Sequence, residues 1–316
     1  MKKIILVLLL VLSLFTISAC KKDKEKEDEE VLEKISVIMP TGTPSLALAN
    51  YVKEAKDADS ADVSLVAGAD LLKSAFINKD KDVIVAPVNL GAMMYNNYEA
   101  YVLYKTFVWG NLYLASKNEL TSINDLNEKT LVVFGQNSTP DIVFKAIMQN
   151  YTDLNVTLEY VDDVATANTM LASGKAEYII SAEPALTKIK AKLGLNVIDL
   201  QEEWKKISGS ESYPQAAIFV LKDKLENKSV KNALNKMVAS VNNAIANPSE
   251  CAKNAVSIHE SFATLTEEVL VQSIPNCHFK LMDDEKEAVK FYIQKMIDLG
   301  FSKQVGGKVP GEGFFA

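Results

Sequence analysis

The chain has 316 residues, of which 48% are hydrophobic, and carries a formal net charge of −7 at neutral pH. That length and apolar share fit two medium-sized lobes or one large domain. The acidic balance argues against nucleic acid or an anionic membrane surface as a partner. No arginine occurs, so any bound anion must rely on lysines, amides, hydroxyls or backbone N–H groups. Codon bias would explain the missing arginine as well as function does.

The N-terminus has the pattern of an exported lipoprotein. Two lysines precede an apolar run, 4–17, and two small residues then lead to Cys20. The run is shorter than the roughly 20 residues that a membrane-spanning helix needs, so it predicts a signal peptide, 1–19, rather than an uncleaved anchor. We expect Cys20 to be lipidated. The charged residues after it predict a solvated tether within 20–33.

Two further cysteines, Cys251 and Cys277, lie in a part of the chain that we expect outside the cytoplasm. They would be able to form a disulfide, although sequence alone cannot give their separation. His259 and His278 are the only histidines, and neither stands at a recognised metal-ligand spacing from a cysteine. We therefore expect no metal site.

From residue 35 onward, short β-rich runs alternate with segments of helical periodicity, which predicts an α/β fold with mostly parallel sheets. The first series consists of 35–39, 45–56, 62–66, 70–78, 82–86 and 90–97. The second series consists of 130–134, 140–150, 156–160, 164–172, 178–181, 184–193 and 196–199. The repetition of one architecture predicts two α/β lobes.

Two extended segments connect the series: residues 102–117 leave the first, and residues 216–221 return to it. Only helical patterns follow, at 230–246, 248–258, 265–274 and 284–299, and these most simply pack around the first sheet. We therefore predict a discontinuous lobe 1, made of 34–116 and 217–316. Lobe 2, residues 117–216, would be inserted into it through two crossover strands.

Ligands of open α/β sheets bind beyond the carboxyl ends of the strands, where helices begin. Two such places share a threonine–proline step that marks a helix start, at Thr43-Pro44 and Thr139-Pro140. Helix starts present free N–H groups and partial positive charge, so two of them facing across a cleft would hold an oxygen-bearing ligand without arginine. Either loop alone would also suit an ordinary capped turn. The ligand contacts that we expect in the two loops are Thr41, Gly42, Thr43, Gln136, Asn137, Ser138 and Thr139.

The next strand ends and the first crossover supply four more candidates. Asn89 and Glu183 follow later strands of each series and offer hydrogen bonds to a ligand, although a helix cap and an exposed acid are the simpler interpretations. Trp109 and Asn111 lie in the first crossover, where an indole would stack on a planar ligand. A core position is the alternative for Trp109.

Several segments resemble substrate-binding proteins related to those for alkanesulfonates, nitrate and thiamine-precursor pyrimidines. They are the Cys20 lipobox, the loops 40–45 and 135–140, the strand end 82–87, the turn 181–184 and the closing 309–315. The resemblance runs in order along nearly the whole chain after the signal. It implies a type II periplasmic-binding-protein fold with the ligand at the lobe interface. It also adds Tyr213 or Gln215, at the return crossover, to the expected contacts.

The resemblance implies a solute-binding lipoprotein of an ABC importer on the outer face of the cytoplasmic membrane. Such a protein closes on a small molecule, passes it to a separate permease with its ATPase, and needs no cofactor and no catalysis; we expect a monomer. Without arginine, a heteroaromatic or pyrimidine-like thiamine precursor is favoured over sulfonate or nitrate. Two alternatives stay open: an enzyme like the menaquinone-pathway dehydratases, with Glu183 or Asp70 as its acid or base, and a surface receptor without transport.

Overall fold

The computed structural model describes residues 32–316. The predicted signal peptide (1–19), the lipidation site Cys20 and most of the predicted tether (20–33) therefore lie outside the described residues. By their contacts, residues 33–316 group into a single unit. None of the helices in the described part has the length and apolar character needed to span a bilayer.

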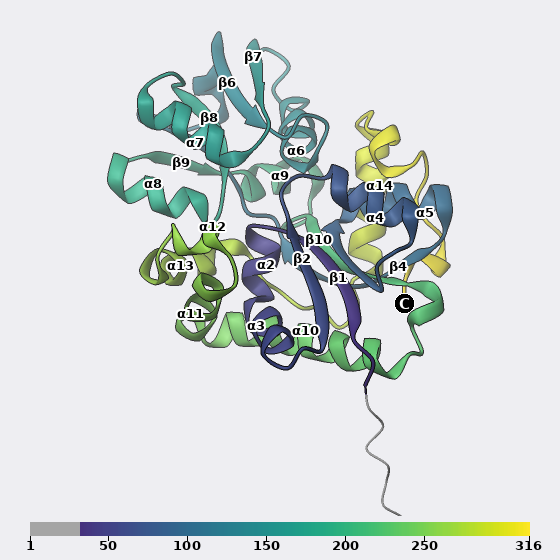
Figure 1. The fold of residues 1–316 in the computed structure, drawn as a ribbon. Coiled ribbons are helices and arrows are strands. Elements are labelled where there is room, and N and C mark those ends of the chain that lie inside the picture. Colours follow the sequence, from purple (N-terminus) through teal and green to yellow (C-terminus); the bar gives the residue numbers. More distant parts are fainter. Residues whose placement is uncertain (1–31) are drawn as a thin grey trace, which may run out of the picture. The chain divides into compact units, whose positions relative to one another are not determined.

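Sheet one has the strand order β2-β1-β3-β10-β4 (Figure 1). Its strands are β1 (Ile35–Pro40), β2 (Ala61–Val66), β3 (Val83–Pro87), β4 (Tyr101–Trp109) and β10 (Pro214–Leu221). β1 pairs in parallel with β2 and β3, whereas β10 is antiparallel to both β3 and β4, so four of the five strands run in one direction. The apolar run of β3 is buried from Val83 to Ala86, as expected for a strand covered on both faces.

Sheet two repeats this design with the order β7-β6-β8-β5-β9. Its strands are β5 (Leu112–Ser116), β6 (Lys129–Phe134), β7 (Val156–Val161), β8 (Tyr178–Ala182) and β9 (Asn196–Asp199). Here β5 is the strand that runs against the other four. The predicted α/β fold class with two mostly parallel sheets is confirmed.

The chain passes between the sheets twice. Residues 110–111 join β4 to β5, and residues 209–213 lead from helix α9 to β10. Gly110 and Asn111 both have positive φ, 95° and 108°, and a side chain on residue 110 would meet Cγ of Gln201 at 2.3 Å. The first crossing is thus a tight turn that needs glycine at its first position. A division into two lobes at these crossings remains our proposal.

Helices cover both faces of each sheet. One face carries α4 (Asp70–Asn78), α5 (Val88–Tyr98) and α14 (Lys286–Asp298) on sheet one, with α6 (Thr139–Met148) and α9 (Leu200–Ser208) on sheet two. The other face carries α2 (Thr43–Ala47), α3 (Ala49–Asp57) and α10 (Lys228–Ala246) on sheet one, with α7 (Val164–Ser173) and α8 (Ala185–Leu193) on sheet two. The single helix predicted at 45–56 is interrupted at Leu48.

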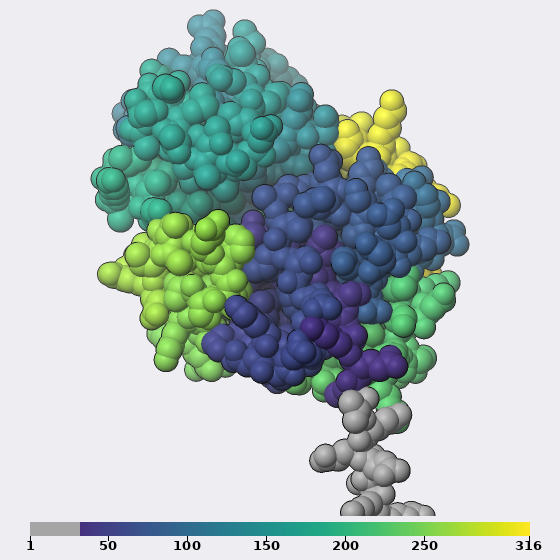
Figure 2. All heavy atoms as spheres, viewed as in Figure 1, coloured from purple at the N-terminus to yellow at the C-terminus, as the bar shows by residue number. Residues whose placement is uncertain are grey.

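Three helices lie outside these layers: α11 (Pro248–Ile258), α12 (Glu260–Ala263) and α13 (Glu267–Ser273). α11 packs on α3, on α12 and on α13, and α13 also contacts α8 of sheet two. Near this contact the Lys188 ammonium donates to the Thr264 carbonyl at 3.0 Å. Figure 2 shows this lime-green group lying directly against the teal segment that carries sheet two. Short 3-10 turns complete the chain at Ile123–Leu126, Lys222–Lys224, Ile274–Cys277, Ser302–Val305 and Glu312–Phe314.

A single hydrophobic cluster includes buried residues of both sheets. Its aromatic centre joins Trp204 of α9, Tyr213 of the second crossing and Tyr292 of α14, with ring centroids 5.5 to 6.3 Å apart. Since α9 belongs to sheet two and α14 to sheet one, this core resists separation of the sheets on that side.

Candidate functional site

Helix starts from the two sheets meet through hydrogen bonds. The Thr43 hydroxyl, at the start of α2, donates to the Glu183 carbonyl just before α8 at 2.5 Å. Asn111 in the first crossing donates from Nδ2 to the Thr43 hydroxyl and, at 3.5 Å, to the same carbonyl. All three side chains are buried. The strand ends of both sheets therefore face one another, but Thr43 meets Glu183 rather than the Thr139 loop that the sequence placed opposite it.

A second contact lies at the neighbouring pair of helices. The Thr139 hydroxyl, at the start of α6, donates to Oδ1 of Asn89 in the first turn of α5 at 3.2 Å. We call Thr43, Asn89, Asn111, Thr139 and Glu183 the helix-start junction. Neither threonine caps its own helix, because each is the first helical residue and the caps fall on Gly42 and Ser138. Their hydroxyls are thereby free to reach the opposite sheet.

One fully buried side-chain atom at the junction has no partner among the described residues. Asn111 is 1% exposed, and its Oδ1 accepts no hydrogen bond in the described structure, although its Nδ2 donates twice. A buried carbonyl oxygen without a donor costs about 1–3 kcal/mol. The junction therefore has an unused acceptor that a donor group would satisfy.

Glu183 has its carboxylate turned into its own helix. The Thr187 N–H and hydroxyl donate to its two oxygens at 3.0 and 2.9 Å. Burial raises the pKa of this carboxyl above its ordinary value, and the two bonds from Thr187 and the charge of Lys190 only partly oppose that shift. Glu183 thus presents its backbone carbonyl, rather than its carboxylate, to Thr43.

The other loop residues predicted to bind ligand are not drawn into these contacts. Gln136 and Asn137 are exposed, while Thr41, Gly42 and Ser138 are partly buried. The Ser138 hydroxyl donates to Gly135 O within its own loop, and the Thr41 backbone N–H donates to Val66 O. They flank the junction without joining the two sheets.

Gln201 connects the two crossings behind the junction. Its Oε1 accepts from the N–H groups of Asn111 and Leu112, both at 3.0 Å, and from the Tyr213 hydroxyl at 2.9 Å. Its Nε2 donates to Asp199 at 2.7 Å. Asn111 therefore contacts the junction through its side chain, and it contacts the Gln201 side chain through its backbone N–H. Tyr213 is fully buried in this contact.

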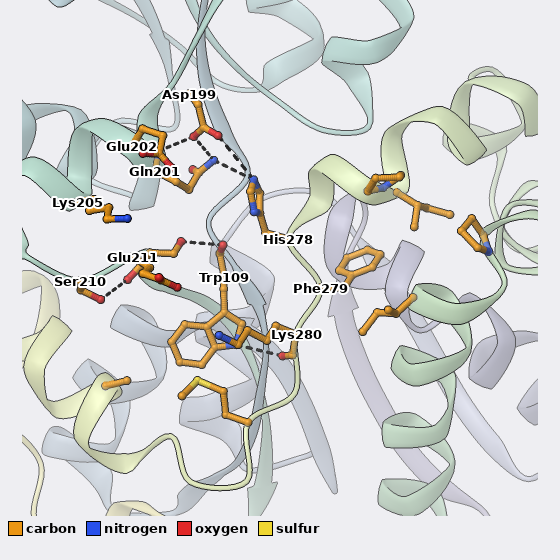
Figure 3. Close-up of a pocket in the computed structure, with 17 residues that line it drawn as sticks. Trp109, Asp199, Gln201, Glu202, Lys205, Ser210, Glu211, His278, Phe279 and Lys280 are labelled. Carbon is orange, nitrogen blue, oxygen red and sulfur yellow. Dashed lines mark hydrogen bonds and ion pairs between the residues drawn. The ribbon is translucent and has the colours of Figure 1, made fainter.

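A cavity of about 860 Å³ opens on the Gln201 side of the first crossing (Figure 3). One wall is the start of α9, with Asp199, Glu202 and Lys205, and the other comes from Ile245, Phe279, Lys280 and Met282 of the C-terminal segments. Trp109 lies between the walls, where its indole N–H donates to Lys280 O at 3.1 Å. We call this space the hinge cavity. Gln215, which is partly buried, has an unpartnered buried Oε1 and does not line the cavity.

His278 was not among the predicted site residues, yet it lines the hinge cavity. Its Nε2 lies 3.1 Å from the Tyr113 hydroxyl, 3.3 Å from Gln201 Nε2 and 4.0 Å from an Asp199 oxygen. Burial lowers the pKa of His278, against the opposing charges of Asp199 and Glu202, and raises the pKa of Asp199. Both shifts disfavour the charged forms, so a neutral imidazole is expected near neutral pH.

The two remaining cysteines are free and buried, so the disulfide that the sequence allowed is not formed in this structure. The Cys251 thiol donates to Leu46 O, and the Cys277 thiol donates to Ser273 O. Both side chains belong to the hydrophobic cluster that the buried sides of α11, α12 and α13 form. Burial raises the pKa of the Cys251 thiol to about 12, so this thiol is unreactive. Within residues 32–316, no group of histidine, cysteine and acidic side chains is arranged to hold a metal ion.

A family model described as menaquinone biosynthesis matches residues 72–297, well over half of the chain. The chain belongs to the menaquinone biosynthesis family. The comparison with curated proteins gave no match.

Solved structures add a likeness in fold to this family assignment. A Parabacteroides distasonis protein described as an ABC transporter has a TM-score of 0.73 at 23% identity, over 89% of this chain and 98% of its own. The aliphatic sulphonate-binding protein SsuA of Escherichia coli has a TM-score of 0.66 at 12% identity, over 88% of this chain and 90% of its own. A ligand-binding component of an ABC-type import system from Staphylococcus aureus has a TM-score of 0.62 at 12% identity, over 89% of this chain and 98% of its own. These likenesses confirm the predicted periplasmic-binding-protein fold.

Proposed function

We propose that this member of the family is a solute-binding protein of an ABC importer, which captures a small organic molecule at the helix-start junction. The likeness in fold to proteins described as ABC transporter components supports a binding role. The position of the junction supports it too, because it lies at the carboxyl ends of parallel strands in both sheets.

The unpartnered oxygen of Asn111 is the observation that carries this proposal. The pairs Thr43–Glu183 and Asn89–Thr139 connect the two sheets directly, so a molecule enters only when these pairs separate. A solute with an N–H donor would then bond to Asn111 Oδ1 and replace the direct contacts with bonds of its own. Opening and closing about the two crossings would couple capture to release.

We further propose a heteroaromatic ligand with a ring N–H or amino group, such as a pyrimidine-like thiamine precursor. The acceptor on Asn111 calls for a donor on the ligand, and the chain has no arginine for a sulfonate or nitrate. The lipid on Cys20 would keep the protein at the outer face of the cytoplasmic membrane, as a monomer beside its permease and ATPase.

The family assignment favours one competing function, an enzyme of the same fold. The chemistry of the junction weighs against it. Both carboxylate oxygens of Glu183 already accept from Thr187, and Asp70 is exposed at the start of α4. In this structure neither carboxylate is directed into the junction, although the raised pKa of Glu183 would suit an acid. Mass spectrometry of a bound solute after long incubation distinguishes the functions, because only an enzyme releases an altered product.

Binding is tested by calorimetry and thermal unfolding of the mature protein with pyrimidines, alkanesulfonates and nitrate. A solute at about 100 times its Kd would stabilise the native state by about 2.7 kcal/mol, which is readily measured. We expect a pyrimidine to bind. Thr139→Val should weaken that binding, because the hydroxyl released when the Asn89 pair separates is then missing as a partner for the solute. The matched control is Thr130→Val, an exposed threonine on β6. Binding of sulfonate alone would contradict the ligand class, and no binding by any solute would contradict the transport proposal.

A further inference from the structure

The hinge cavity is a concave site that lies apart from the buried helix-start junction. Its lining includes residues at both crossings, namely Trp109 in the first and Ser210 to Ser212 in the second. Asn111 separates the two sites, since its side chain bonds into the junction while its backbone bonds to Gln201 on the cavity side. A volume of about 860 Å³ is ample for a small organic molecule.

The carboxylates of the cavity lack cationic partners. Asp199 is partly buried, and its one ion-pair contact among residues 32–316 is His278, at 4.0 Å. Glu202 and Glu211 also line the cavity; both are exposed, and neither forms an ion pair with any described residue. Asp199 Oδ1 accepts from the Gln201 N–H and from Gln201 Nε2, both at 2.7 Å, yet burial still raises the pKa of Asp199. A bound cation beside this carboxylate would stabilise its charged form.

The opposite side of the cavity is apolar apart from Lys280. Ile245, Phe279 and Met282 line it together with the ring of Trp109, and Ile245 is 46% exposed despite its size. Figure 3 shows Trp109 below the polar group formed by Asp199, Gln201 and Glu202. An indole face also attracts a positive charge.

We propose that the hinge cavity binds a small organic cation with an apolar or aromatic body. The ammonium lies toward Asp199 and Glu202, and the body packs on Trp109, Phe279 and Met282. Lys205 and Lys280 also line the cavity and, like Glu202 and Glu211, are exposed. The three carboxylates of the lining outnumber these two lysines, whose long side chains reach solvent. An organic anion, drawn by those lysines, is the outcome that would contradict the proposal.

The test compares three probes of one shape: 2-phenylethylamine, 2-phenylethanol and 3-phenylpropionate. Calorimetry should show the amine binding more tightly than the alcohol, with the carboxylate weakest. Asp199→Asn keeps the side-chain oxygen that caps α9 but loses the charge, so affinity for the amine should fall by about tenfold, which corresponds to about 1.4 kcal/mol. Equal binding of the three probes, or no binding of the amine, would overturn the proposal.

A matched variant controls for general electrostatics. Glu119→Gln removes one negative charge from an exposed residue that does not line the cavity, and it should leave amine binding unchanged. Unfolding curves establish that Asp199→Asn is folded, and Glu202→Gln provides a second cavity variant if it is not. If Glu119→Gln weakens amine binding as much as Asp199→Asn does, the attraction of the amine does not come from the cavity carboxylates and the proposal fails. A solute whose binding responds to Thr139→Val but not to Asp199→Asn belongs to the junction, so the two proposals fail separately.

Discussion

The carboxyl group of Glu183 is held in a buried position that disfavours its charge. It ionises near its ordinary pKa in the unfolded chain but only at higher pH in the folded protein, because burial raises its pKa. Between these two values the folded state binds more protons than the unfolded state. The free energy of unfolding therefore falls as pH rises through this window.

Glu183→Gln should remove this pH dependence. The amide keeps an acceptor for the Thr187 N–H and gains a donor for the Thr187 hydroxyl, and it is neutral at every pH of interest. We expect the variant to match the wild type below the window and to be the more stable protein above it. Urea unfolding from about pH 4 to about pH 8 measures this. Glu177→Gln, at an exposed residue near β8, should follow the wild-type curve, and parallel curves for all three proteins would show that Glu183 titrates normally.

At the scale of elements, helix α5 approaches strand β10 through a glycine. A side chain on residue 91 would place its Cβ 2.0 Å from the Phe219 ring, which is itself fully buried. Phe219 in turn packs edge-on against Phe76 of α4 and contacts Phe314 near the C-terminus. The close approach thus positions α5, and with it Asn89, at the junction.

Gly91→Ala should destabilise the protein by about 1–3 kcal/mol, because overpacking outweighs the higher helix propensity of alanine. The matched control is Gly311→Ala, where φ is −73° and an added Cβ meets no atom within 4 Å. Urea unfolding gives the midpoint of each variant. If the m-values are equal, a difference in midpoint is a difference in stability. Equal midpoints for both variants would mean that Phe219 moves aside at no cost.

Local periodicity predicted most elements well. The bounds of α4, α11 and β9 agree with the predicted 70–78, 248–258 and 196–199 because each is bordered by strong local signals, such as Pro248 at a helix start. Helix α9 was missed, although Leu200, Trp204 and Ile207 have helical spacing, Asp199 caps the start and Gly209 ends the helix. Its charged residues hid the pattern, and the omission also hid Gln201.

At the scale of the whole molecule, contacts distant in sequence determine the sites. The facing of Thr43 and Thr139 toward the other sheet followed from the duplicated strand–helix order. The hinge cavity did not follow, because it brings together Trp109, Asp199 and His278, which no local pattern links. A single sequence gives no spacing signal for such a site, since the fold alone places these residues side by side.

Under the proposed function, capture of a solute requires the two sheets to separate at the junction, and two direct hydrogen bonds between the sheets there oppose that movement. The double variant Thr43→Val/Thr139→Val removes both hydroxyls, which leaves the Glu183 carbonyl and Asn89 Oδ1 without these donors. Unsatisfied Asn89 Oδ1 favours an opened form by about 1–3 kcal/mol, since water then reaches it. The Glu183 carbonyl keeps only the 3.5 Å contact from Asn111 Nδ2 and acts in the same direction. Small-angle X-ray scattering should show a larger radius of gyration than the roughly 19 Å expected for a closed chain of this length.

The control for this experiment is Thr130→Val/Thr157→Val, which alters two exposed threonines that face each other on β6 and β7. It makes the same chemical change twice on sheet two but leaves the junction intact, so its scattering should match that of the wild type. If the junction variant stays as small as the control while both remain folded, the hydrogen bonds do not hold the sheets together. The aromatic centre of Trp204, Tyr213 and Tyr292 would then be the contact that keeps the molecule closed.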